Sequence, residues 1–351
     1  MFENTSSIRT ELSSLGEFGL IKHIRQHVLL NNESTLCGIG DDAAVVKYAE
    51  NKHTLVSTDM LIEGVHFDLT YCPLKHLGYK AVSVNVSDIY AMNGTPKQIL
   101  VSLAVSNRFS LEAIEELYAG MLLACKRFDV DLIGGDTSSS RSGMVINITV
   151  LGESDKDDIV YRSGAKESNL LCVSGDLGSA YLGLQLLERE KKIFMENPGV
   201  QPDMEGQDYL LERQLKPEAR KDIIKQLKEA GVKPTSMIDV SDGLASEVLH
   251  LCTESNVGCL LYENKIPIDD SAVQRAKEFN LNPTMCALNG GEDYELLFTV
   301  DIKDHDKIKK CKDISVIGHI TSQSEGMNLV LTGTEMLVAL KAQGWDSLLK
   351  K

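Results

Sequence analysis

Residues 170–180 have the sequence LLCVSGDLGSA and carry the clearest fold signal in the chain. The apolar run at 170–173 predicts a buried strand, and Gly175 and Gly178 predict a tight loop directly after it. The apolar residues that follow from Ala180 onward predict a helix. A strand, a glycine loop and a helix in this order are typical of proteins in which strands and helices alternate, so this stretch favours an α/β fold.

Other parts of the chain show the same alternation. Apolar patterns predict strands at 99–105, 131–133, 144–152, 237–240 and 295–300, and a strand that ends at 55–58. Helical spacing predicts helices at 19–30, 74–91, 110–128 (with Ser110 as its cap), 217–230 and from 244 through Cys252. The pattern as a whole indicates an α/β fold of the α+β type.

The length of 351 residues exceeds the usual size of one domain and predicts two. The sequence turns polar and charged at 154–168, before the next predicted strand begins at Leu170. Domain boundaries fall in such exposed, polar segments. We therefore expect an N-terminal domain at 1–155 and a C-terminal domain at 156–351.

Acidic residues outnumber basic residues by 51 to 36, which gives a formal net charge of −15. Binding to DNA or RNA needs a basic surface, so a nucleic-acid partner is not expected. No apolar run approaches the ~20 residues that a membrane helix needs, so no membrane partner is expected either. Residues 1–19 lack the apolar core of a signal peptide, and we expect a cytoplasmic protein.

Aspartates next to glycine, serine or threonine recur at the ends of predicted strands or helices. The segments are GIGDD (38–42), STD (57–59), NVSD (85–88), GGD (134–136) and DVSDG (239–243). Carboxylates and hydroxyls are the oxygen ligands that Mg²⁺ takes, and ligands of open α/β sheets bind at the carboxyl ends of strands. Carboxylates brought together repel one another unless a cation neutralises them. A single Asp-Gly or Asp-Asp segment is commonly a turn or a helix cap, so the prediction of a metal site rests on the set.

The usual nucleotide-binding motifs are absent from the sequence. It contains no Walker A pattern and no kinase H-R-D or D-F-G segment, and Gly38 and Gly40 lack the third glycine of a dinucleotide fingerprint. If the protein handles ATP, it does so with another architecture.

The ordered set of motifs resembles one family. The segments are GEF (16–18), GIGDDA (38–43), STDMLIEGVHF (57–67), the stretch from Lys80 to Asp88, GGDT (134–137), RSGA (162–165), DVSDG (239–243) and GGEDYEL (290–296). Together they are similar to those of the thiamine monophosphate kinase family, in the superfamily that includes aminoimidazole ribonucleotide synthetase and selenophosphate synthetase. The resemblance extends from about Gly16 to Gly344.

The resemblance implies a fold and an activity. It implies an N-terminal mixed sheet with helices that pairs in a homodimer, and a C-terminal α/β domain that completes the active site. It implies phosphorylation of thiamine monophosphate to thiamine diphosphate, with ATP as co-substrate and several Mg²⁺ ions. Small molecules are therefore the expected partners.

The resemblance also implies roles for individual residues. The implied Mg²⁺ ligands are Asp42, Ser57, Thr58, Asp59, Asp88, Asp136, Asp239 and Asp242. The aspartates among them (Asp42, Asp59, Asp88, Asp136, Asp239 and Asp242) are the implied catalytic residues. The implied ATP contacts are Tyr118, Gly135, Asp136, Arg162 and Ser241, and the implied contacts to the thiamine substrate are His66, Glu292 and Trp345.

Several of these residues also have a purely structural interpretation. His66 is compatible with a half-buried structural histidine, and Glu292 with a cap on the turn before a strand. Tyr118 and Trp345 are compatible with core or surface aromatics, and Arg162 with a solvated linker residue. Asp41 is compatible with a role in the geometry of its neighbour. After Trp345 the sequence departs from the family, which often continues with His-Phe. The stretch 188–207 is longer than usual for the family and predicts a surface insertion, in which 196–207 form an exposed loop.

The chemistry of the acceptor suits this set of residues. A phosphate monoester is largely dianionic near neutral pH because its second pKa is ~6, so it needs no strong general base. Cation clamping and in-line positioning should then dominate, which predicts direct transfer without a phosphoenzyme. Three alternatives remain open: another ATP-using member of the same superfamily, a catalytically inactive nucleotide-binding paralogue, and a divalent-metal hydrolase.

Overall fold

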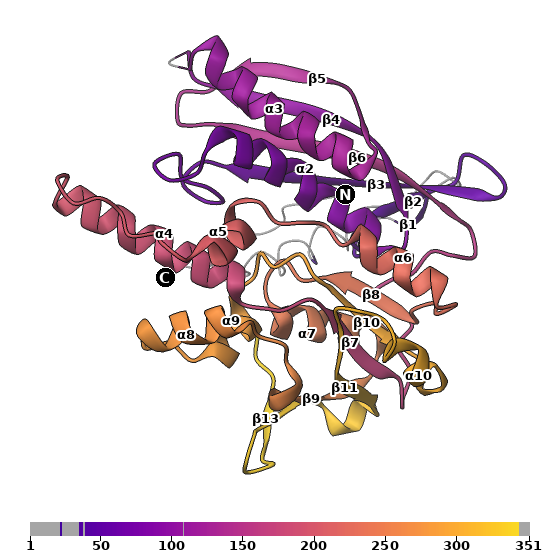
Figure 1. The fold of residues 1–351 in the computed structure, drawn as a ribbon. Coiled ribbons are helices and arrows are strands. Elements are labelled where there is room, and N and C mark those ends of the chain that lie inside the picture. Colours follow the sequence, from indigo (N-terminus) through magenta and orange to yellow (C-terminus); the bar gives the residue numbers. More distant parts are fainter. Residues whose placement is uncertain (1–21, 23–34, 38, 108, 344–351) are drawn as a thin grey trace, which may run out of the picture.

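The protein folds into two sheets with helices, in a computed structural model that describes residues 22, 35–37, 39–107 and 109–343. The first half supplies a six-stranded sheet in the order β1-β2-β3-β6-β4-β5, and the second half a seven-stranded sheet in the order β13-β12-β9-β11-β7-β10-β8. Figure 1 shows the first half above the second, with α2 on the side that faces the second half. This arrangement is the α/β class that the sequence predicts.

The elements of the first half are β1 (Thr35–Cys37), β2 (Ala44–Val46), β3 (Lys52–Ile62), α2 (Leu74–Ala91), β4 (Thr95–Val105), α3 (Leu111–Phe128), β5 (Asp131–Ser139) and β6 (Val145–Asp155). All strand pairs in this sheet are antiparallel except β4 with β5, which α3 connects. The sheet is therefore mixed, as expected.

The elements of the second half are β7 (Leu170–Ser174), α4 (Ser179–Glu196), α5 (Asp208–Leu215), α6 (Lys221–Glu229), β8 (Ser236–Asp239), α7 (Leu244–Ser255), β9 (Gly258–Tyr262), η2 (Glu263–Lys265), α8 (Asp270–Glu278), α9 (Pro283–Asn289), β10 (Leu296–Val300), η3 (Ile302–Asp304), α10 (His305–Ile308), β11 (Ile314–Thr321), η4 (Gln323–Glu325), β12 (Met327–Val330) and β13 (Leu337–Ala339). The pairs in this sheet are antiparallel except β12 with β9.

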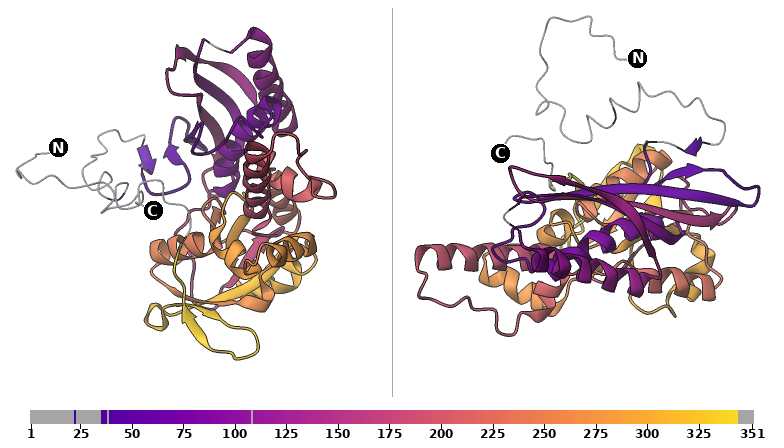
Figure 2. Two further views of the ribbon diagram at one scale, coloured as in Figure 1. Left: turned by 90° about the vertical axis from the view of Figure 1, so that its left-hand side faces the viewer. Right: turned by 90° about the horizontal axis from the view of Figure 1, so that it is seen from above.

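The core of the first half lies between the sheet and two helices. Every second side chain of β6 is buried, and Ile146 and Ile148 pack in one cluster with Leu77 of α2 and Leu117 of α3. Figure 2 shows both helices on the same side of the sheet. The alternation of buried and half-buried side chains is the period-two pattern of a sheet that is covered on one face.

Helix α2 is buried on nearly all sides. A Cβ atom on Gly78 would lie 1.9 Å from the carbonyl oxygen of Leu117, and one on Gly120 would lie 1.9 Å from that of Lys75. Glycine at both positions lets the backbones of α2 and α3 touch. The opposite side of α2 faces β8 and α5 of the second half, so its polar residues lie inside the molecule.

Strand β10 of the second sheet, which lies between β7 and β8, is covered on both faces. Phe298 of β10 packs with Leu227 of α6, whereas its neighbour Leu297 belongs to the cluster that contains Leu251 of α7. A strand buried on both faces appears in the sequence as a continuous apolar run, as 296–300 does.

The two halves share their cores. Ile159 and Ala219 lie beyond Asp155, yet they pack in the core of the first half. Conversely, Ala91 of α2 packs in a cluster with Phe298 and Leu227. This shared packing fixes the two halves against each other and so fixes the width of any cleft between them.

Many of the predicted elements are confirmed. The helix at 74–91 has the predicted bounds, and Ser110 caps α3 by accepting a hydrogen bond from the Ala113 N–H at 3.3 Å. The strand, loop and helix at 170–180 form as β7 and α4. Residues 197–207 are a largely exposed connection, and 188–196 form the last part of α4. That 188–207 is an insertion relative to the family stays a prediction.

Two predicted strand ends are wrong. Strand β3 does not end at 55–58 but continues to Ile62, and β5 continues past 133 to Ser139. In both cases pairing with a long neighbour, β6 or β4, overrides the local sequence signal. The helix predicted at 19–30, the motif at 16–18 and Trp345 lie outside the described residues.

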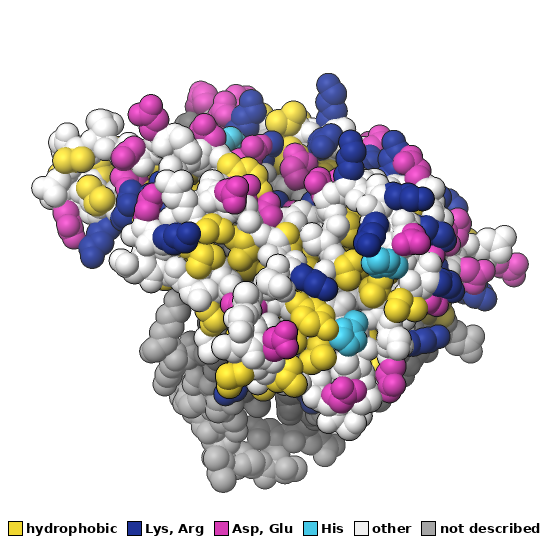
Figure 3. All heavy atoms as spheres, turned by 60° about the horizontal axis from the view of Figure 1, so that its bottom comes forward, with side chains coloured by type: hydrophobic (Ala, Val, Ile, Leu, Met, Phe, Trp, Pro, Cys, Tyr) yellow, Lys and Arg dark blue, Asp and Glu magenta, His cyan; other side chains and the backbone are white. Residues whose placement is uncertain are grey.

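The surface carries charges of both signs. On the face drawn in Figure 3, lysine and arginine side chains are interspersed with aspartate and glutamate rather than gathered in one basic stripe. Within the part of the chain that the structure describes, none of the helices has the length and apolarity that crossing a bilayer needs.

Candidate active site

A cleft of about 2080 Å³ lies between the two halves and is lined by residues of both. It contains most of the residues that the sequence singles out. These are Asp42, Ser57, Thr58, Asp59, His66, Asp88, Arg162, Asp239, Ser241, Asp242 and Glu292. The fold therefore brings into one cavity residues that are up to 250 positions apart in the sequence, from Asp42 to Glu292.

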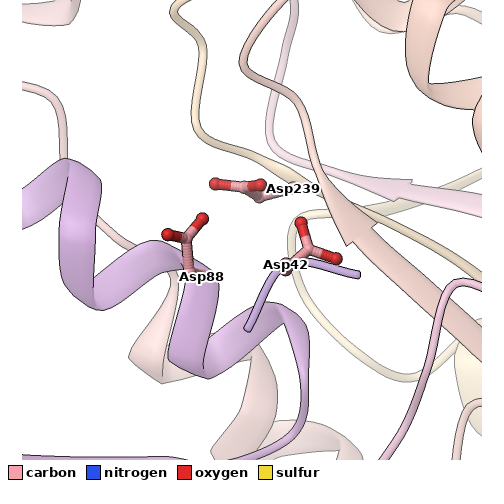
Figure 4. A group of neighbouring side chains, drawn as sticks. All are labelled: Asp42, Asp88 and Asp239. Atoms are coloured by element: carbon pink, nitrogen blue, oxygen red, sulfur yellow. The ribbon is translucent and has the colours of Figure 1, made fainter. Parts of the chain in front are cut away.

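Three carboxylates form the centre of this cleft. Asp42 precedes β2, Asp88 lies on α2 and Asp239 is the last residue of β8. Each offers one oxygen, and these oxygens lie within 4.8 Å of one another. Figure 4 shows the three side chains converging from separate elements. Asp239 lies at the carboxyl end of a strand and Asp88 in the last turn of a helix, as expected, whereas Asp42 lies at the end of neither.

Two serines orient the cluster. Ser57 Oγ donates a hydrogen bond to Asp88 Oδ2 at 2.5 Å, and Ser87 Oγ donates one to Asp239 Oδ2 at 2.5 Å. Asp59 lies on the same face of β3 as Ser57, and its backbone N–H donates to the Asn85 side chain of α2 at 3.0 Å. Short hydrogen bonds of this kind fix which oxygen of each carboxylate faces the centre.

The cluster strongly disfavours negative charge. Burial, followed by repulsion from Asp42, raises the pKa of Asp239 to about 8 and that of Asp59 to about 6. Burial, followed by repulsion from Asp59 and Asp239, raises the pKa of Asp88 well above its ordinary value. Carboxylates in this situation either hold protons or bind a cation.

The donor set fits a divalent metal ion. All ligand atoms of the cluster are oxygens, which hard cations such as Mg²⁺ prefer, and no histidine or cysteine belongs to it. A bound cation would remove the repulsion that raises the pKa values of Asp59, Asp88 and Asp239. The geometry therefore supports the predicted metal site.

Arg162 is paired with the cluster rather than solvated. Its Nε and Nη2 donate to the two oxygens of Asp42, both at 3.0 Å, and the Asp42 side chain is 1% exposed. Asp41 accepts the backbone N–H of Arg162 at 3.3 Å, so it holds the segment that carries the arginine. Burial, followed by repulsion from Asp42, raises the pKa of Asp41 to about 7.

Asp242 lies in the loop between β8 and α7. Its backbone N–H donates to Glu247 Oε1 at 3.0 Å, and the Ser241 hydroxyl donates to Asp242 Oδ2 at 3.4 Å. Glu247 is buried in the first turn of α7, and burial followed by repulsion from Asp242 raises its pKa well above the ordinary value. This loop is joined to the next motif, because Ser241 O accepts the Glu292 N–H at 2.7 Å.

His66 and Glu292 lie in the same cleft as the carboxylate cluster. His66 Nδ1 accepts the Ile62 N–H at 3.0 Å, so a neutral ring carries its proton on Nε2. The Glu292 carboxylate accepts from Lys80 Nζ at 3.0 and 3.1 Å and from Gln214 Nε2 at 2.6 Å. Both side chains are thus held in defined orientations.

Known proteins share this fold and sequence along nearly the whole chain. The thiamine-monophosphate kinase of Bacillus subtilis is 34% identical over 95% of this chain and 99% of its own length, and that of Aquifex aeolicus is 34% identical over 95% and 98%. The chain belongs to the thiamine-monophosphate kinase family. Residues 40–154 match the model of the AIR synthase related protein, N-terminal domain.

A solved structure of this family supports the same assignment. AaThiL complexed with AMPPCP and TMP has a TM-score of 0.81 to this protein and 32% sequence identity, and the match covers 97% of this chain and 100% of that chain. The agreement therefore includes both sheets.

Three of the described residues that the family resemblance implies for the site lie outside the cleft. Tyr118 is half-buried on α3, and Gly135 and Asp136 lie on β5, whose side chains are almost all exposed. Two strands, β6 and β4, separate β5 from β3, which corresponds to a distance of ~14 Å. Packing alone explains why position 135 is a glycine, because a Cβ atom there would lie 1.8 Å from the carbonyl oxygen of Val101. Trp345 is outside the described residues.

Thr58 lines the cleft, but its hydroxyl points away from the three carboxylates. It donates to the carbonyl oxygen of Ile148 at 3.0 Å and lies 3.1 Å from the Thr149 hydroxyl. Adjacent residues on a strand point to opposite faces, so Ser57 and Thr58 cannot both present their side chains to the cluster.

Three residues of the site are not predicted from the sequence as site residues. Lys80, Gln214 and Glu247 are buried and contact Glu292 or Asp242. Lys80 is part of the quoted motif, but helical spacing alone does not distinguish a buried lysine from a solvated one. Gln214 contacts Glu292 from 78 residues away, so no local pattern reveals that contact. Glu247 lies only five residues from Asp242, but a glutamate in the first turn of a helix is ordinarily exposed, so its burial is not visible in the sequence.

Proposed function

We propose that the protein transfers the γ-phosphoryl group of ATP to thiamine monophosphate, forming thiamine diphosphate and ADP. The observation that carries this proposal is the buried cluster of Asp42, Asp88 and Asp239 in the same cleft as His66 and Glu292. The structural match to AaThiL complexed with AMPPCP and TMP also supports the proposed function.

Mg²⁺ is the proposed metal, with Asp42, Ser57, Asp59, Asp88, Asp239 and Asp242 as its proposed ligands in the cleft of one chain. Asp136, which the family resemblance also implies, is proposed to reach the metal in the cleft of a partner, and the Thr58 hydroxyl is not proposed as a ligand because it points away from the carboxylates. Bound Mg²⁺ neutralises the charge that develops on the transferring phosphoryl oxygens. The chain's own residues orient the reactants. Arg162 is suited to phosphate because its guanidinium already lies at the cluster, and Ser241 lies in the adjoining loop.

The transfer is proposed to be direct. The acceptor is itself a phosphate with a second pKa of ~6, so its attacking oxygen is already ionised near neutral pH. The residues of the cleft then have to hold two anionic groups in line and exclude water, and no side chain is needed as a nucleophile.

The assay that tests this function measures ADP release by the purified protein with Mg²⁺ and ATP, with and without thiamine monophosphate. Release that depends on the acceptor and yields thiamine diphosphate supports the proposal. Equal release without the acceptor indicates a hydrolase, and release only with a different phosphate or amine acceptor indicates another reaction of the superfamily. Acid-stable labelling of the protein by [γ-³²P]ATP would contradict direct transfer.

We further propose that residues 1–155 and 156–351 act as two domains and that the protein is a homodimer. Strand β5 is the edge of the first sheet, its side chains are exposed, and Ile133 on it is 58% exposed. Tyr118, Gly135 and Asp136 lie too far from the cleft of their own chain to contact ATP there. Pairing of two first sheets would let these residues serve the cleft of the partner. The cytoplasmic location remains a prediction from the sequence.

Mixing two inactive variants tests this arrangement. Asp136→Asn and Asp239→Asn homodimers are each expected to be inactive, and mixing them after dissociation should restore about a quarter of the wild-type activity, because half of the dimers then hold one intact site. The measurement is acceptor-dependent ADP release at fixed total protein, with light scattering to establish the dimer. Activity that stays at the level of the separate variants would argue that Asp136 serves its own chain or no site at all.

A contact at one side of the cleft links α4 to the loop that carries His66. Lys191 Nζ lies 2.6 Å from Asp68 Oδ2, and the Tyr71 hydroxyl donates to Glu188 Oε1 at 2.7 Å. All four residues line the cleft. Because this pair of contacts restrains the loop on the substrate side, we expect it to support acceptor binding.

Lys191→Met should raise the KM for thiamine monophosphate about threefold and leave the KM for ATP unchanged, since a partly exposed ion pair contributes up to about 1 kcal/mol. Lys192→Met, a change at an exposed lysine of the same helix, is the matched control and should have no effect. Steady-state kinetics with each substrate varied in turn measures both. If both variants raise the KM for thiamine monophosphate equally, the loss of a positive charge on α4, and not the loss of the contact to Asp68, is responsible.

A further inference from the structure

Lys80 is a buried lysine at the junction of the two halves. It lies on α2, and its side chain is 2% exposed. Its Nζ donates to both oxygens of Glu292, at 3.0 and 3.1 Å, and to the carbonyl oxygen of Gln214 at 3.3 Å. One ammonium group therefore joins α2 of the first half to α5 and to the 290–296 motif of the second half.

The contacts of Lys80 determine the orientation of the Glu292 carboxylate. Glu292 has a left-handed backbone conformation with φ 59°, and its side chain is 26% exposed to the cleft. Besides Lys80, Gln214 Nε2 donates to Glu292 Oε2 at 2.6 Å. An ionised carboxylate has about four acceptor positions, so three donated hydrogen bonds leave about one for a ligand in the cleft.

Stability alone does not explain a lysine at this position. Burial of an ammonium group and a carboxylate has a desolvation cost that their attraction roughly offsets, and apolar residues of similar size are often as stabilising. A methionine or leucine at position 80 would fill the same interior space. The specific consequence of the lysine is that the Glu292 carboxylate is held in one orientation before a ligand enters.

We propose that Lys80 is a positioning residue that presents the Glu292 carboxylate to the thiamine part of the acceptor. This inference rests on the proposed function. Thiamine carries a positively charged thiazolium ring and an aminopyrimidine N–H group, and both complement a carboxylate. A carboxylate that is already oriented binds such groups more tightly because no rotamer freedom is lost on binding.

The decisive variants are Lys80→Met, Glu292→Gln and the double variant. Lys80→Met should raise the KM and the calorimetric Kd for thiamine monophosphate about tenfold, with the KM for ATP unchanged. In the Glu292→Gln background, Lys80→Met should weaken acceptor binding no further, because the lysine acts through the glutamate. Each single variant leaves one buried charge unpaired, so the double variant should unfold at a higher temperature than either one.

Two additional variants separate positioning from folding. Lys216, directly after α5, forms ion pairs with Glu212 and Glu218 and none with Glu292. Lys216→Met should therefore leave acceptor binding unchanged. Gln214→Leu removes one donor to Glu292 together with the buried Gln214 Oε1, which has no hydrogen-bond partner among the described residues. It should therefore fold at least as stably as the wild type and still bind the acceptor about threefold more weakly.

The outcomes distinguish this inference from the proposed function. If the wild-type protein forms thiamine diphosphate and both Lys80→Met and Gln214→Leu retain its KM for the acceptor, the positioning role is wrong and the function stands. If acceptor affinity in the double variant recovers along with stability, the role of Lys80 is structural and the inference is overturned. If the wild-type protein neither binds nor phosphorylates thiamine monophosphate, the proposed function is wrong and the inference falls with it.

Discussion

Asp239→Asn is expected to make the metal-free protein more stable at pH 8.5 and at the same time to lower kcat/KM about a thousandfold. Asp239 is buried, and burial followed by repulsion from Asp42 raises its pKa to about 8. Asparagine retains an acceptor for the Ser87 hydroxyl but carries no charge. Loss of one carboxylate from the cluster removes a metal ligand, which accounts for the loss of activity.

The sign of the pH dependence follows from the direction of the shift. A carboxyl group with a raised folded-state pKa is protonated in the folded state over a range where the unfolded chain has already lost its proton. Its contribution to stability is complete below the unfolded pKa of 3.8 and is lost as the pH rises through about 8. Thermal unfolding in EDTA should therefore show that the advantage of the variant grows between pH 5.5 and 8.5, by roughly 2–3 kcal/mol.

Asp157→Asn is a suitable control, because Asp157 is exposed. It should change neither the pH dependence of unfolding nor the activity. Saturating Mg²⁺ should stabilise the wild-type protein more at pH 8.5 than at pH 5.5, since the cation replaces the bound protons. An Asp239→Asn variant that is no more stable than the wild type at pH 8.5 without metal would contradict the account of the cluster.

Arg162→Met is expected to destabilise the protein by about 3 kcal/mol, because it leaves the Asp42 carboxylate buried without its counter-charge. Arg162 Nε and Nη2 contact both oxygens of Asp42 at 3.0 Å, and the Asp42 side chain is 1% exposed. Arg162→Lys retains the charge but not the two parallel hydrogen bonds, so its effect should be smaller. Urea unfolding in EDTA measures these differences.

The double variant Asp42→Asn with Arg162→Met tests the cause. It removes both charges, so most of the stability lost in Arg162→Met should return. Activity should not return, because both a proposed metal ligand and a proposed phosphate contact are missing. If the double variant loses as much free energy of unfolding as the two single variants lose together, the loss in Arg162→Met comes from packing of the arginine side chain and not from the ion pair.

Local signals in the sequence are sufficient to predict much of the fold. The bounds of α2 and the Ser110 cap of α3 agree with the structure because apolar spacing and capping are properties of neighbouring residues. The lengths of β3 and β5 depend on pairing with strands that are distant in the sequence, and there the predicted strand ends are wrong.

The site shows the same division between local and long-range information. The motifs that contain Asp42, Asp88 and Asp239 are visible in the sequence, and the fold places them together. Asp239 and Asp88 lie at a strand end and a helix end as predicted, whereas Asp42 lies in the turn before β2, where neither pattern places it. The partners that orient them, such as Ser87 for Asp239 and Lys80 for Glu292, come from elements more than a hundred residues away, so no local pattern reveals them.

The most direct test of the central claim follows the label from [γ-³²P]ATP in the presence of thiamine monophosphate, in the wild-type protein and in Asp239→Asn, as Mg²⁺ is varied. The account predicts that label appears in thiamine diphosphate only when Mg²⁺ is present, and about a thousandfold more slowly in the variant. Label that appears only in inorganic phosphate would contradict it. So would transfer to thiamine monophosphate at the same rate in Asp239→Asn as in the wild type.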